Sequence, residues 1–95
     1  MSRDLTLRLE RFCRVALRKS KGRIDPEDVR RCVTALKRFI SDREMLVTEL
    51  EKELTDIGIR RDIAENYIVK EAVKLRERMA AELARVGREA GSEEE

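Results

Sequence analysis

The sequence predicts an all-α protein: a three-helix antiparallel bundle with a long central helix, completed by dimerisation. Apolar residues recur at steps of three and four along almost the whole chain, which is the period of a helix with one buried face. Turn-forming residues gather at only two internal places, at 22–26 and around Gly58. The 95-residue length suits one domain, which we place at residues 1–87.

The first helix is predicted from about Asp4 to Lys19. Its apolar residues fall on one stripe, at Leu5, Leu9, Phe12, Cys13 and Ala16. At about 100° per residue, the arginines fall on the other side, at Arg8, Arg11, Arg14 and Arg18. The helix is therefore amphipathic, with a basic outer face.

A second helix is predicted to begin at Pro26, after a turn at Gly22, because Asp25 is a good N-cap and proline suits the first helical position. Apolar positions mirror one another across this turn: Ala16 with Val29, Cys13 with Cys32, Phe12 with Val33, Leu9 with Leu36, and Leu5 with Ile40. This symmetry predicts an antiparallel αα-hairpin. We expect Cys13 and Cys32 to face each other as small buried residues, with a disulfide as the alternative.

The stretch SDREMLVTEL, from Ser41 to Leu50, has two interpretations. Ser41 followed by Glu44 matches a capping box, which marks a helix start. The apolar stripe nevertheless continues through it, at Val33, Leu36, Ile40, Val47, Leu50, Leu54 and Ile57. We favour one continuous helix, since no Gly or Pro lies between Glu27 and Ile57. A compact four-helix domain with a break at Ser41 is the alternative.

Gly58 is expected to end this helix, with Ile59 contacting Leu54 as in a Schellman motif. Asp62 with Glu65 offers a D-x-x-E start for the last helix. That helix is predicted to reach about Val86, and Gly87 to close it. Residues 88–95 end in an acidic run that we interpret as a disordered, solubilising tail.

With a continuous central helix, half of the second hairpin would expose apolar residues. That strip is the predicted partner-binding surface, at Met45, Leu46, Leu50, Tyr67 and Ile68. The sequence thus favours a non-enzymatic helical interaction or oligomerisation protein, a homodimer or a small subunit of a larger assembly.

The alternative function rests on charge. The first 23 residues carry eight basic and two acidic side chains, although the whole chain has a net charge of only +2. The candidate contacts to duplex DNA or RNA phosphates are Arg8, Arg11, Arg14, Arg18, Lys19, Lys21 and Arg23. The competing explanation is a solvated face, paired with glutamates of a neighbouring helix.

No motif for chemistry stands out. The chain has no histidine, the two cysteines lack C-x-x-C spacing, and the four glycines form no phosphate loop. We therefore expect no catalytic residue, cofactor, metal or small-molecule substrate. No apolar run is long enough to span a membrane and no signal peptide is evident, so we expect a cytoplasmic protein. The absence of glutamine and the excess of arginine are typical of a thermophile or of a GC-rich genome.

Overall fold

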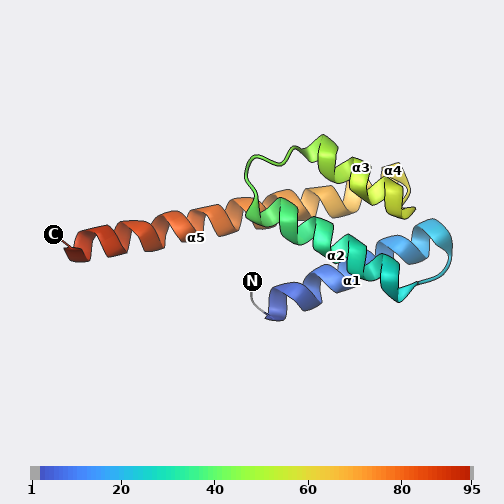
Figure 1. The fold of residues 1–95 in the computed structure, drawn as a ribbon, viewed down its shortest axis with the longest axis horizontal. Helices are drawn as coiled ribbons and strands as arrows, with labels where there is room; N and C mark the ends of the chain where they lie inside the picture. The colour runs from blue at the N-terminus through green and yellow to red at the C-terminus, as the bar shows by residue number, and fades with distance from the viewer. Residues whose placement is uncertain (1–2, 95) are drawn as a thin grey trace.

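The computed structural model describes residues 3–94, except for the side chains of Leu83 and of residues 85–94. The helices are α1 (Arg3–Lys21), α2 (Pro26–Ser41), α3 (Val47–Ile57), α4 (Arg61–Ile63), the π-helix η1 (Ala64–Val69) and α5 (Lys70–Glu94). The last three follow one another without interruption, so the described residues form four helical rods and no strand (Figure 1). The predicted all-α class is confirmed.

The predicted hairpin of α1 and α2 is confirmed in its ends and in its register. Gly22 adopts a left-handed φ of 74° after α1, and Asp25 caps α2 by accepting a hydrogen bond from the Glu27 amide at 3.0 Å. Cys13 and Cys32 are fully buried and form a disulfide between the two helices, with their Cα atoms 5.9 Å apart. The mirror symmetry thus paired the right residues, and the alternative of a disulfide is the one that the structure contains.

The continuous central helix is wrong, because a helix ends at Ser41. The Ser41 hydroxyl donates back to the carbonyl oxygen of Lys37 at 2.8 Å, and the Asp42 amide bonds to the Arg38 carbonyl. Ser41 therefore closes α2 and does not cap a new helix. The next helix begins at Val47, where the Leu46 amide donates to the Glu49 carboxylate at 3.2 Å.

The segment between α2 and α3 is held by its own hydrogen bonds and by α5. The Asp42 carboxylate accepts from the Glu44 amide at 3.0 Å, which makes an Asx turn. Met45 is buried, and its carbonyl accepts a hydrogen bond from Arg76 at 2.8 Å. The Arg76 guanidinium also lies 3.8 Å from the centre of the Phe39 ring. These contacts let α3 fold back beside α2.

The end of α3 follows the prediction, whereas the start of the last rod does not. Gly58 has a φ of 110°, and the Ile59 amide bonds to the Leu54 carbonyl at 3.1 Å, as a Schellman ending requires. The rod then begins with Arg60 as its N-cap, two residues before the predicted Asp62. No side chain of the rod caps it. The Arg60 amide donates instead to the Ser20 hydroxyl of α1 at 2.9 Å.

The core lies where α1, α2, α3 and η1 meet, and its largest fully buried side chains are Phe39, Leu9, Leu17, Leu36, Leu50, Leu54, Ile59 and Ile68. The C-terminal part of α5 leaves this core and extends alone beyond the bundle (Figure 1). The backbone of α5 stays helical through Glu94, past the predicted end at Gly87. The domain limit at residue 87 and the disordered tail at 88–95 stay predictions, since Glu95 and the side chains of 88–94 lie outside the described part.

Candidate nucleic-acid interface

The strip predicted to bind a protein partner lies mostly in the core of this chain. Met45, Leu50 and Ile68 are buried, and Tyr67 is half-buried. Leu46 alone among the five is well exposed, at 61%. The break at Ser41 is the reason, because α3 folds back and covers the surface that a continuous helix would have left bare. As a set, these residues cannot form an exposed docking surface.

The basic residues of α1 are placed as predicted. Arg11, Arg14 and Arg18 are exposed, and their spacing of three and four residues puts them on one side of the helix. At 1.5 Å per residue, they cover about 10.5 Å along the helix axis. Arg8, Lys19 and Arg23 are also exposed, so they extend the basic surface around α1 and into the following turn.

Six of the seven predicted phosphate contacts form no ion pair with any described residue. The ion pairs of the described residues lie elsewhere, at Lys21–Asp28, Arg30–Glu27, Arg38–Glu53, Arg60–Asp62, Arg61–Glu65 and Lys74–Glu71. The expectation that glutamates of a neighbouring helix would neutralise this face is therefore wrong for the described side chains. The face keeps its positive charge.

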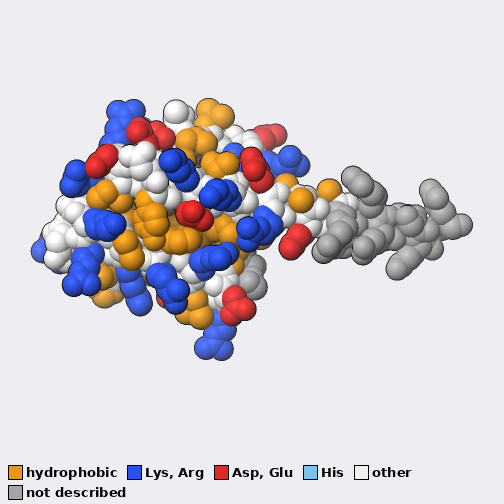
Figure 2. Space-filling model, turned by 180° about the vertical axis from the view of Figure 1, so that it is seen from behind, with side chains coloured by type: hydrophobic (Ala, Val, Ile, Leu, Met, Phe, Trp, Pro, Cys, Tyr) orange, Lys and Arg blue, Asp and Glu red, His pale blue; other side chains and the backbone are white. Residues whose placement is uncertain are grey.

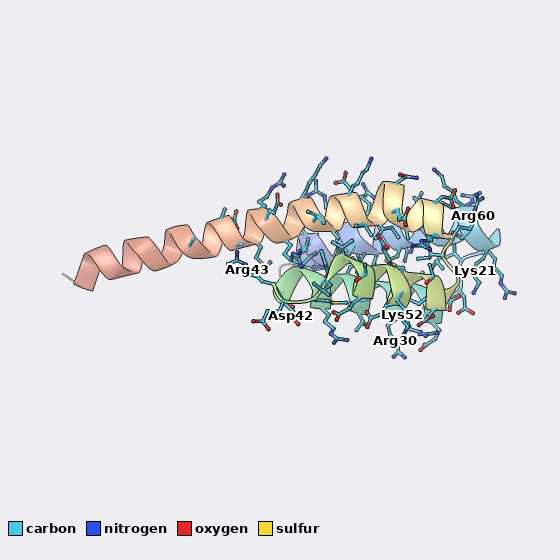
Figure 3. All side chains as sticks on the ribbon, turned by 90° about the horizontal axis from the view of Figure 1, so that it is seen from above. Lys21, Arg30, Asp42, Arg43, Lys52 and Arg60 are labelled. Atoms are coloured by element: carbon cyan, nitrogen blue, oxygen red, sulfur yellow. A yellow bond between two sulfur atoms is a disulfide. The ribbon has the colours of Figure 1, made fainter. Side chains whose placement is uncertain are left out.

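Lys21 is the exception among the seven. Its ammonium group donates to Asp28 at 2.9 Å and to the carbonyl of Ile57 at 3.3 Å. It thereby ties the end of α1 to α2 and α3, and Figure 3 shows it beside Arg60, at the end of the bundle away from the projecting part of α5. We assign Lys21 a structural role and remove it from the candidate contacts.

All three aromatic rings make contacts within the bundle. Phe12 and Tyr67 pack edge to face, with ring centres 5.5 Å apart, and Phe39 is buried beneath Arg76. Lys19 lies over the Tyr67 ring, with its ammonium 6.0 Å from the ring centre. This arrangement suits contact with the phosphates of a duplex better than binding of unpaired bases.

Figure 2 shows the face on which α1, η1 and the start of α5 lie. Lys and Arg side chains surround a strip of apolar side chains, and Asp and Glu are fewer. The half-buried apolar residues of these elements include Leu5, Phe12, Tyr67, Leu75 and Met79. These five residues pack against the core.

Two open depressions adjoin α1. A groove of about 670 Å³ runs between α1 and α2, with Val29 and Val33 at its floor and Arg14, Arg30 and Lys37 along its sides. A smaller notch of about 320 Å³ lies between the N-terminal part of α1 and α5. The sequence did not single out the α5 residues of this notch. The sequence signal for this notch was the apolar stripe of α5, which is longer than the helices that pack against it.

No group of three or more His, Cys, Asp or Glu within the described residues is arranged to hold a metal ion. No helix in that part of the chain is long and apolar enough to cross a membrane. Comparison with protein-family models, with curated proteins and with solved structures finds no match for this chain. Its function is therefore inferred from the chemistry of its own residues.

Proposed function

We propose that this protein is a non-enzymatic helical protein that binds duplex nucleic acid, contacting phosphates through α1. The observation that carries the proposal is the set of exposed basic side chains without an acidic partner among the described residues: Arg8, Arg11, Arg14, Arg18, Lys19 and Arg23. Basic side chains clustered on one helix are the electrostatic footprint of phosphate binding.

The placement of the acidic residues strengthens this argument. The chain has 20 Asp and Glu for 22 Lys and Arg, so acids were available to neutralise α1. Like charges spaced four residues apart on a helix, as at Arg14 and Arg18, destabilise it by a few tenths of a kcal/mol. A face kept positive at some cost to stability is expected where a polyanion binds.

The mechanism is displacement of counterions. Each phosphate neutralised by a Lys or Arg releases condensed cations, and log K then falls with log salt concentration by about 0.9 per contact. Contacts limited to phosphates position a protein without reading the base sequence. We therefore expect little sequence preference, and binding to both DNA and RNA duplexes.

The test compares two triple variants by fluorescence anisotropy of a labelled duplex. The first, R11A/R14A/R18A, removes three unpaired charges from α1. The matched control, R38A/R60A/R61A, removes the same charge from side chains that are already ion-paired with Glu53, Asp62 and Glu65. Circular dichroism shows that each variant is folded, and alanine favours the helix at all three α1 positions.

The first variant is expected to bind more than about tenfold more weakly at 0.1 M salt, and its salt slope to be smaller by about 2.7. The control is expected to keep most of the affinity. Unchanged binding by R11A/R14A/R18A would overturn the proposal, and an equal loss in both variants would show that only net charge matters.

A further inference from the structure

The notch between α1 and α5 is apolar at its centre and charged at its edges. Leu5 of α1 and Leu75 and Met79 of α5 line its centre, and all three are half-buried. Arg8 and Arg78 supply the positive charges of its edges, and Asp4 and Glu82 the negative ones.

The notch lies where α5 leaves the bundle. Among the described side chains of α5, Met79 is the last that packs against the core. From Met79 to Glu94, α5 continues for 15 residues, which is about 22 Å of helix. Figure 1 shows no other helix beside its C-terminal part. A lone helix of this length is marginal in water, because most helical stability in proteins comes from packing of an apolar face.

The charges at the notch are self-complementary. Two cations and two anions surround the apolar centre, and none of the four forms an ion pair with another described residue. An acidic partner would face Asp4 and Glu82, and a basic one would face Arg8 and Arg78, so either would meet repulsion. A second copy of this chain meets neither, because a two-fold axis brings each anion opposite a cation.

The spacing on α5 fits such an axis. Arg78 and Glu82 are four residues apart, so they lie on the same side of the helix, and both line the notch with Leu75 and Met79. Two copies of α5 that cross in antiparallel fashion on this side, at the level midway between the two residues, place Arg78 beside the partner's Glu82, and Glu82 beside the partner's Arg78.

We propose that this protein forms a two-fold symmetric dimer in which α5 crosses the partner's α5 over the notch, covering Leu5, Leu75 and Met79. The inference does not depend on the phosphate-binding face, since the dimer forms without nucleic acid. Arg8 borders both the basic face and the notch, and for this reason the variant R11A/R14A/R18A leaves it unchanged.

The test uses charge reversal on the full chain, with the mass in solution measured by sedimentation equilibrium over a range of concentrations. R78E and E82R each place like charges across the axis, so each is expected to be monomeric. The double variant R78E/E82R restores opposite charges and is expected to be a dimer, as is the wild type. K52E is the control, because Lys52 lies on α3, on the side of the bundle away from α5 (Figure 3).

Each outcome decides the matter. A dimeric wild type and K52E, monomeric single variants and a dimeric double variant would support this crossing of the two α5 helices over the notch. A wild type that stays monomeric at the highest concentration would overturn the proposal. A dimer that persists in both single variants would also overturn it, since the contact would then lie elsewhere.

Discussion

Reduction of the Cys13–Cys32 disulfide should destabilise the protein by about 3 kcal/mol. The bond joins residues 19 apart in sequence and thus closes a loop of about 20 residues in the unfolded chain. The chain-entropy relation for a loop of that size gives a loss of about 11 cal/mol/K, or about 3 kcal/mol at 25 °C. Both cysteines are fully buried, so the two thiols of the reduced protein keep their places in the core. For a domain of this size, the loss corresponds to a fall in Tm of about 12 to 25 °C.

The assay is a thermal melt followed by circular dichroism, for protein refolded with and without reductant. The oxidation state of each sample is confirmed by mass spectrometry after alkylation. The double variant C13A/C32A is the control, and its Tm should not respond to reductant. The reasoning is refuted if oxidised and reduced wild type melt within a few degrees of each other.

Three further predictions concern the packing and the turns. Leu50→Ala should lower the free energy of unfolding, measured in urea, by about 2 to 5 kcal/mol, whereas Leu46→Ala should change it by no more than about 0.5 kcal/mol. The reason is that Leu50 is fully buried and Leu46 is exposed. Equal effects of the two substitutions would contradict the observed core. Gly58→Ala should destabilise more than Gly22→Ala in the same assay, since both glycines have positive φ but only the new Cβ at 58 would meet another side chain, 3.0 Å away. Arg76→Ala should lower the free energy of unfolding by about 1.5 to 3 kcal/mol and speed amide hydrogen exchange in the 42–46 segment. The reason is that the Arg76 hydrogen bond and ring contact hold that segment to α5. Unchanged exchange would argue against this role of Arg76.

Much of the fold could be predicted where capping and turn residues mark the same helix ends as the spacing of the apolar residues. Asp25, Pro26 and the mirrored stripes specified the first hairpin and brought Cys13 opposite Cys32. Gly58 marked the end of α3 correctly, because a left-handed residue at that position needs no tertiary contact to be recognised.

The break after Ser41 was not predictable from period alone. Leu50, Leu54 and Ile57 keep helical spacing within α3, so the stripe looks continuous although the helix is interrupted. Besides its local hydrogen bonds, the break has two tertiary contacts: Met45 is buried, and Arg76, 31 residues away, bonds to its carbonyl. Neither contact leaves a mark in the local sequence.

The candidate site, too, could be predicted from the sequence only in part. The apolar stripe of α1 determines which side of this helix faces the core, and therefore which side faces outward. The arginines on the outward side are exposed as expected. Lys21 differs because its partners, Asp28 and Ile57, come from other helices. Most residues of the predicted partner strip are buried, because that prediction assumed a continuous helix through Ser41.

The most direct test of the central claim, that α1 presents an unpaired phosphate-binding face, is the salt dependence of wild-type binding to a duplex. With three to six phosphate contacts, log K should fall linearly with log salt concentration at a slope of about −2.7 to −5.4. This corresponds to a loss of affinity of about 40-fold to 2,000-fold between 50 and 200 mM salt. Absence of binding at 50 mM, or binding that does not change over this range, would contradict the claim.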